Sequence, residues 1–192
     1  MDKFNNPQFH TKGMILLAIK YIAETDEIGL LQYTHDDDWD MHRCWQDIDT
    51  QRGYNGAYYQ SLDEYSQSIN IDQFKFWVTV TDKTTGCKVG SLRLGSDEDH
   101  PDLAIWIYPE HRNKGYGLKS FRLSLEYIFN NFDLDEIWAG CFTDNKYSMT
   151  ILTKLGFEHC PEYDETEPHF ITGEDTTMLE LRLSREKFQK LK

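Results

Sequence analysis

Three features are scarce in this sequence, and each scarcity excludes a class of protein. The longest aliphatic run near the start, Met14 to Ile19, is far too short to cross a bilayer, and no signal-peptide layout is visible. The four cysteines form no Cys-x-x-Cys pair and have no histidine at metal-ligand spacing. Lysine and arginine number 20 against 33 aspartates and glutamates. We therefore expect a cytoplasmic protein with reduced thiols and no metal, and neither nucleic acid nor a membrane as its partner.

The chain also lacks internal divisions. No repeat and no linker rich in proline, glycine or serine interrupts the 192 residues, a length that suits one sizeable core. We predict a single domain over residues 1–192, with its folded core at 13–184. The net charge of −13 favours a cationic partner, although an acidic surface that only maintains solubility fits equally well.

The most informative stretch runs from Leu103 to Asn131. Its first five residues, LAIWI, are uniformly apolar, as is typical of a buried strand. Tyr108-Pro109-Glu110 ends this strand, because proline cannot donate to a sheet. A turn with the sequence HRNKGYG follows, and from Leu118 the apolar residues recur at helical spacing. The predicted order is strand, glycine turn, helix.

Such a turn is suited to binding an anion. Gly115 and Gly117 leave the backbone accessible, so the unpaired N–H groups at the helix start can point at one phosphate, and Arg112 and Lys114 add positive charge. A P-loop is excluded because no Gly-Lys-Ser/Thr occurs. A dinucleotide fingerprint fits poorly because Ser120 replaces its third glycine.

Two blocks of sequence resemble the GNAT acetyltransferase superfamily. The first is Arg112-x-x-Gly115-x-Gly117 between a strand and a helix, which resembles its acetyl-coenzyme-A signature. The second spans 136–157 and carries Asn145, Ser148 and the run Lys154-Leu155-Gly156-Phe157. The pattern is most similar to the subgroup that acetylates the amino termini of ribosomal proteins, which also contains small-molecule acetyltransferases. The resemblance implies an α/β fold with a central mixed sheet of six to seven strands and helices on both faces.

The remaining elements follow from periodicity and from turn residues. Thr34 or Asp36 is expected to cap a helix, and Ser61 to Ile69 to form another with a capping box. We expect strands at 13–22, 74–80 (half-buried), 87–94, 135–142, 157–160 and 177–183. Thr143 or Asp144 is expected to cap a helix that runs through Leu155 and is ended by Gly156. A loop at 161–169 and a tail helix from Ser184 complete the prediction.

The resemblance also implies how acetyl-CoA is held. The pantetheine arm would pair with the backbone of Ile105, Trp106 and Ile107, in a gap where this strand splays from the next. The pyrophosphate would rest on backbone N–H groups of Arg112, Asn113, Lys114, Gly115, Tyr116, Gly117 and Leu118. Asn145 would touch the arm from the other side.

Acetyl transfer needs a base, a group that stabilises the oxyanion and an acid for the leaving thiolate. A backbone N–H near Ile107 can polarise the thioester. The family's usual tyrosine acid is replaced by Leu152, whereas Ser148 matches the serine of the ribosomal subgroup, or it simply satisfies the helix start. Asp102 is the expected base, with Glu98, Glu110, Glu162 and His169 as alternatives. Attack is expected to be direct, because no His or Asp is placed to activate Cys141.

Three acidic segments, at 36–40, 97–102 and 162–167, fall on elements that line the acceptor side in relatives. They favour a cationic acceptor, either a small polyamine-like or aminosugar amine or the amino terminus of a basic peptide. The rival interpretation is a catalytically degenerate acyl-CoA sensor or interaction module with the same fold. Homodimerisation stays open at this level.

Overall fold

The strands of the protein form two sheets that are joined at a single point. The computed structural model describes residues 19–191. One sheet is antiparallel with the order β1-β2-β3-β4-β5, and the other has the order β6-β9-β7 with β8 also paired to β9. The strands are β1 (Ala23–Glu24), β2 (Ile28–Gln32), β3 (Trp77–Asp82), β4 (Lys88–Leu94), β5 (Leu103–Ile107), β6 (Glu136–Phe142), β7 (Glu158–His159), β8 (Glu165–Pro168) and β9 (Asp175–Ser184). The junction is one parallel bridge between Asp102 and Trp138.

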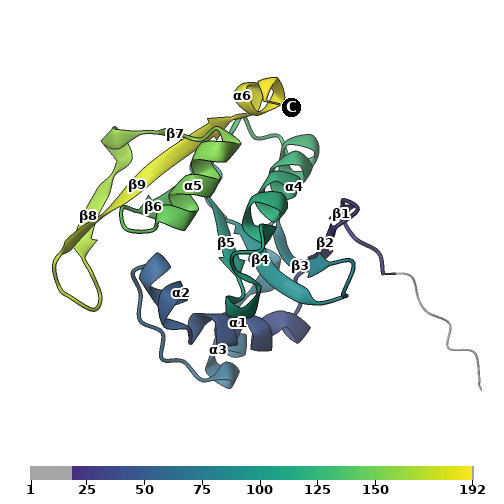
Figure 1. The fold of residues 1–192 in the computed structure, drawn as a ribbon, viewed down its shortest axis with the longest axis horizontal. Helices are drawn as coiled ribbons and strands as arrows, with labels where there is room; N and C mark the ends of the chain where they lie inside the picture. Colours follow the sequence, from purple (N-terminus) through teal and green to yellow (C-terminus); the bar gives the residue numbers. More distant parts are fainter. Residues whose placement is uncertain (1–18, 192) are drawn as a thin grey trace, which may run out of the picture.

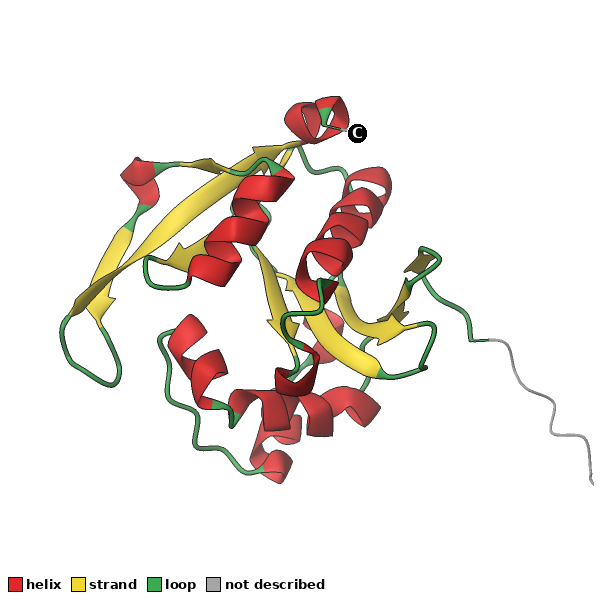
Figure 2. Ribbon diagram, in the orientation of Figure 1, coloured by secondary structure: helices red, strands yellow, loops and turns green. Residues whose placement is uncertain are grey.

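Helices cover both faces of these sheets (Figures 1 and 2). On one face α4 (Tyr116–Asn131) packs against the first sheet and against α5 (Lys146–Leu155), which lies on β6. On the other face lie α1 (Asp38–Trp45), α2 (Ile48–Gly53) and α3 (Leu62–Ser68). The chain ends with α6 (Arg185–Lys190), packed against β9. Short 3-10 turns η1 (His35–Asp37), η2 (Ile71–Gln73), η3 (Pro109–His111) and η4 (Pro161–Tyr163) connect these elements.

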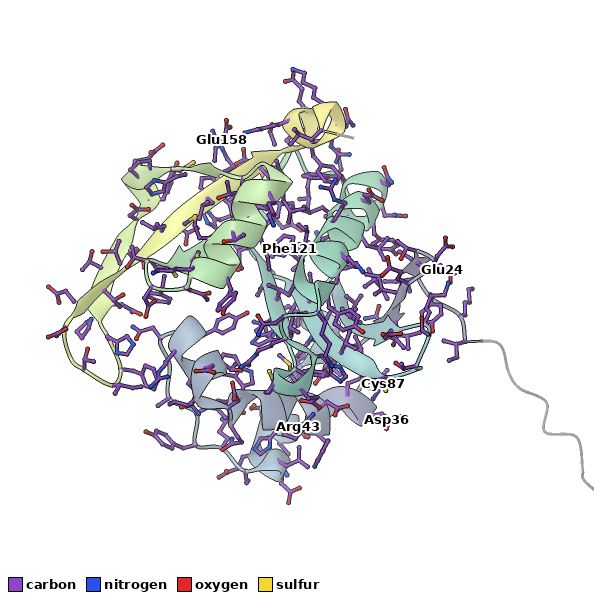
Figure 3. The ribbon with its side chains drawn as sticks, in the orientation of Figure 1. Glu24, Asp36, Arg43, Cys87, Phe121 and Glu158 are labelled. Atoms are coloured by element: carbon purple, nitrogen blue, oxygen red, sulfur yellow. The ribbon has the colours of Figure 1, made fainter. Side chains whose placement is uncertain are left out.

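Two hydrophobic clusters follow from this layering. The larger lies between the sheets and helices α4 and α5; its Phe121, labelled in Figure 3, is 1% exposed and meets Phe157 edge-on. The smaller is aromatic and lies under the helices of the other face; it contains Tyr33, Tyr65, Trp77, Trp106 and Tyr108. Because both clusters contact the first sheet, β3 is buried on both faces, and the prediction of a half-buried strand is wrong.

Local signals in the sequence placed several helix ends correctly. Thr34 starts η1 in a capping box with Asp37, and Ser61 starts α3 in a capping box with Glu64. Gly156 ends α5 in the left-handed conformation, at φ 89°. The side chain of Ser184 accepts a bond from Lys187 N at the start of α6. At the three helix starts a side chain satisfies unpaired backbone groups, whereas Gly156 ends α5 through its own left-handed backbone.

Other expectations differ from the structure. The first strand, expected at 13–22, lies mostly outside the described residues, and residues 19–22 precede β1 instead of forming a strand. The helix α2 was not predicted, and 161–169 contains η4 and β8 instead of an unbroken loop. The described chain has nine strands in two sheets, where one sheet of six to seven was expected. Short strands such as β1 and β8 form by pairing with distant partners, which local periodicity does not reveal.

Candidate active site

The strands β5 and β6 diverge, which leaves a gap in the backbone pairing between them. They pair only at their beginnings, where Asp102 bridges Trp138 and Trp138 N donates to the Pro101 carbonyl at 3.0 Å. Beyond that point, within residues 19–191, β5 has only β4 as a sheet neighbour and β6 has only β9. The predicted splay between these two strands is therefore present.

The register of β5 decides which of its peptide groups face the gap. Gly95 N donates to Asp102 O at 2.7 Å, and Tyr108 N donates to Val89 O at 3.0 Å. Because bonded pairs alternate along an antiparallel ladder, the peptide groups of Trp106 also face β4. Those of Ile105 and Ile107 face the gap, while the peptide groups of Trp106, also expected to hold the pantetheine arm, do not.

Tyr54, just after α2, reaches into this gap. Its hydroxyl donates to the carbonyl of Ile105 at 2.6 Å. Its ring stacks on Trp106 with centroids 5.2 Å apart and planes within 12°, and it also contacts Trp45. Burial raises the pKa of the Tyr54 hydroxyl, so this group stays protonated and acts as a donor. The sequence indicated a tyrosine-rich loop near the acceptor but did not place this side chain inside the gap.

The glycine turn lies at the end of β5 and opens α4. Gly115 is the N-cap at φ 83°, in the left-handed region that glycine tolerates. Gly117 is buried in the first turn, where a Cβ would come within 2.8 Å of Ile151 Cδ1. The bond from Lys119 N to Gly115 O begins the helix, so the N–H groups of Tyr116, Gly117 and Leu118 precede the helical ladder. Three donors and the positive end of the helix dipole thus lie at one point.

The two basic residues of this turn differ in their availability. The guanidinium of Arg112 contacts Asp47 Oδ2 at 2.7 Å, donates to Thr50 Oγ1 at 2.7 Å, and donates through Nε to the Ile107 carbonyl at 3.2 Å. It ties α2 to the end of β5. Asn113 also has a left-handed backbone, at φ 60°, and the side chain of Lys114 is exposed. Lys114 is therefore the freer cation for a phosphate.

The start of α5 forms the opposite wall. Asn145 is the N-cap: its Oδ1 accepts from Ser148 N at 3.1 Å, and its Nδ2 donates to the Gly53 carbonyl at 3.4 Å. Burial raises the pKa of the neighbouring Cys141 thiol, while the Ser148 hydroxyl opposes that shift. A buried thiol of raised pKa is a poor nucleophile. Leu152 is 1% exposed within the larger cluster, so that position offers no acid.

Asp102 differs from the alternative bases in its environment. It lies at the closed end of the gap, and burial raises the pKa of its carboxyl, although Arg93 and His100 oppose the shift. Glu98 is paired with Lys75, and Glu110 is paired with Arg43. The Nδ1 of His169 accepts from backbone N–H groups of its own loop, and the side chain of Glu162 is exposed.

The three acidic segments are only partly free to attract a cation. Asp37 and Asp38 are buried: Asp37 caps η1 and pairs with Lys88, and Asp38 accepts from Tyr33 at 2.8 Å. Asp36 and Arg43, labelled in Figure 3, lie on the same side of the molecule, away from the gap. The side chain of Asp97 accepts bonds within its own loop. The aspartates at 36–40 are thus mainly structural.

A further carboxylate, missed in the sequence, lies next to Asp102. Glu180 is only 9% exposed, on the same face as Trp138 at the closed end of the gap. A glutamate between two leucines in an alternating strand looks solvent-facing, so only the structure reveals its burial. No group of three or more potential metal ligands occurs among residues 19–191, and none of the helices described there is long and apolar enough to cross a membrane.

The comparisons with known proteins agree with this geometry. The acetyltransferase (GNAT) domain profile matches residues 16–158. The chain is 24% identical over 151 residues to the uncharacterised N-acetyltransferase YoaA of Bacillus subtilis strain 168, covering 71% of this chain and 82% of that protein. The structure is similar to a spermidine N-acetyltransferase from Vibrio cholerae solved with CoA and spermine, with a TM-score of 0.74 and 20% identity. The match covers 86% of this chain and 99% of that chain. It is also similar to a GNAT acetyltransferase from Bacillus anthracis, with a TM-score of 0.69 and 17% identity, over 85% of this chain and 98% of that chain.

This chain belongs to the GNAT acetyltransferase family. The predicted fold class and the predicted kind of enzyme, an acetyl-CoA-dependent N-acetyltransferase, are confirmed.

Proposed function

We propose that this enzyme acetylates a primary amine of a small, multiply cationic acceptor of the polyamine type. The observation that carries the proposal is the gap between β5 and β6, which has the helix-start donors of α4 at one end and the half-buried carboxyl of Asp102 at the other. A donor cluster suits a phosphate, and an acidic end suits an ammonium group. The structurally similar enzyme from Vibrio cholerae is named for spermidine and was solved with spermine, which supports this acceptor class.

The β5 side of the gap would hold acetyl-CoA. The peptide groups of Ile105 and Ile107 face the gap and would pair with the pantetheine arm, with the Ile107 N–H polarising the thioester. The pyrophosphate would rest on the N–H groups of 112–118, with Lys114 supplying charge from solvent. For the arm to use the Ile105 carbonyl, the Tyr54 hydroxyl must release it.

The chemistry then proceeds by direct attack. Asp102, directly or through a water, takes a proton from the ammonium group, and the neutral nitrogen attacks the thioester carbon. The new C–N bond forms, the C–S bond breaks, and the proton that the acetylated nitrogen then loses passes to the departing thiolate. Ser148 is proposed to pass that proton, positioned by the bond from its N–H to Asn145 Oδ1. Asn145 also fixes the start of α5 against Gly53.

The experiment is a thiol-release assay with acetyl-CoA and a panel of acceptors: spermidine, spermine, an aminosugar, a simple monoamine and a basic peptide with a free amino terminus. Turnover concentrated on the polyamines supports the proposal. Preference for the peptide would instead assign the protein to the ribosomal-type subgroup, and acetyl-CoA binding without turnover on any acceptor would identify a sensor.

A charge reversal in the glycine turn tests the acetyl-CoA site in the same assay. Lys114→Glu is expected to raise the KM for acetyl-CoA about fivefold or more, because an exposed phosphate contact becomes repulsive. Lys154→Glu makes the same charge change at an exposed position near the end of α5 and should leave that KM unchanged. Equal effects from both variants would contradict the proposed position of the pyrophosphate.

A further inference from the structure

Glu180 is a buried carboxylate that the fold does not fully satisfy. It is 9% exposed, yet within the described residues no hydrogen bond reaches its Oε2. The imidazole Nε2 of His100 lies 3.5 Å from Oε2, which is long for a hydrogen bond. Buried charges are normally paired and fully hydrogen-bonded, because leaving one unsatisfied is costly. A carboxylate that is left in this state suits a cationic ligand.

The residue opposite Glu180 keeps the approach open. Glu180 pairs across the sheet with Gly140 of β6, which is exposed. A Cβ at Gly140 would lie 3.1 Å from Glu180 Oε1 and 3.1 Å from Met178 Sδ. Any larger residue there would crowd the carboxylate on its solvent side. The glycine thus leaves a route to a carboxylate that is otherwise covered.

The walls around this carboxylate are aromatic. His100 stacks on Trp138 with centroids 4.3 Å apart, and Tyr163 meets Trp138 edge-on at 4.9 Å. Aromatic faces attract ammonium groups, and they do so most strongly where water is excluded. Burial raises the pKa of Glu180, and the nearby charge of Asp102 adds to that effect while His100 opposes it. The two carboxylates are therefore close enough to interact.

We propose that Glu180 binds a second, non-reacting ammonium group of the acceptor, a few carbons from the amine that faces Asp102. The inference rests on the proposed function, since it assigns a role within the same acceptor site. It makes Glu180 a specificity-determining residue: a diamine gains a desolvated ion pair that a monoamine of equal length does not. Asp102 acts on the reacting nitrogen, and Glu180 fixes the distance to the next one.

The test compares 1,4-diaminobutane with n-butylamine, which have the same carbon chain. The wild-type enzyme should favour the diamine in kcat/KM, and Glu180→Gln should lower the diamine value about 30-fold, mainly through KM. The n-butylamine value should change by no more than about twofold, since that acceptor has no second ammonium. Glu174→Gln removes the same charge from an exposed position in the turn between β8 and β9 and should change neither value.

A second variant keeps the test valid if Glu180→Gln folds poorly. Gly140→Ala retains the carboxylate but fills the approach, and it should reduce the preference for the diamine in the same way. Turnover without a preference for the diamine, or an equal loss for both amines in Glu180→Gln, refutes the inference and leaves the proposed function standing. Absence of turnover with every amine in the wild-type enzyme refutes the proposed function, and this inference with it.

Discussion

Replacing Tyr54 with phenylalanine tests how the gap changes when acetyl-CoA binds. In the free protein the Tyr54 hydroxyl occupies the Ile105 carbonyl, one of the groups proposed to pair with the pantetheine arm. The substitution removes only that hydroxyl and keeps the ring stacked on Trp106. We expect Tyr54→Phe to bind acetyl-CoA more tightly and to be less stable without it.

The magnitude follows from this one bond. An intramolecular hydrogen bond contributes about 1 kcal/mol net, and the wild-type protein must break this one before the arm can use the carbonyl. Removing the competitor should lower the Kd for acetyl-CoA about fivefold, since about 1.4 kcal/mol corresponds to tenfold. The free variant should unfold about 2–4 °C earlier, as about 1 kcal/mol implies for a chain of this length.

Calorimetric titration with acetyl-CoA and thermal unfolding with and without saturating ligand measure both effects. Tyr58→Phe is the matched control, because its hydroxyl donates to Gln60 Oε1 at 2.6 Å in the exposed part of the same loop. Weaker binding by Tyr54→Phe would refute the reasoning, since it would mean that the hydroxyl contacts the ligand instead of competing with it.

Three further predictions follow from the packing and charge of the site. Arg112→Lys should change the Kd for acetyl-CoA by no more than about twofold. It should lower the Tm by a few degrees, because the guanidinium joins α2 to β5. A loss of affinity equal to that of Lys114→Glu would contradict this. Leu152→Ala should destabilise the protein by about 2–5 kcal/mol in denaturant unfolding, and a loss below about 1 kcal/mol would show that this site is not well packed. Asp102→Asn should lower kcat and raise the stability of the protein at pH 8. The stability difference should narrow as the pH falls through the raised pKa of Asp102, because protonation then removes the half-buried charge from the wild type. A stability difference independent of pH would contradict the raised pKa of this carboxyl.

The parts of the site that depend on local signals could be predicted from the sequence. The apolar run 103–107 became β5 with those bounds, and the glycine turn became the start of α4. The cap of α5 was expected at Thr143 or Asp144 and lies just beyond them, at Asn145. Each of these features is written in consecutive residues whose period, caps or glycines have a direct physical meaning.

The remaining features depend on contacts between distant segments. Tyr54 reaches Ile105 across 51 residues, and Arg112 reaches Thr50 across 62. Nothing within the tyrosine-rich loop distinguishes Tyr54 from its neighbours, because its role depends on where α2 packs. The burial of Glu180 also depends on distant segments. Alternation along β9 places its side chain on the face that the leucines do not occupy, and the aromatic layer of His100, Trp138 and Tyr163 lies on that face.

The most direct test of the central claim is the product of the reaction. The purified enzyme is incubated with acetyl-CoA and a polyamine, thiol release is followed, and the polyamine is analysed by mass spectrometry. The account predicts one acetyl group on a primary amine for each thiol released. Acetyl-CoA binding with neither thiol release nor acetylated amine, across the whole acceptor panel, would contradict it.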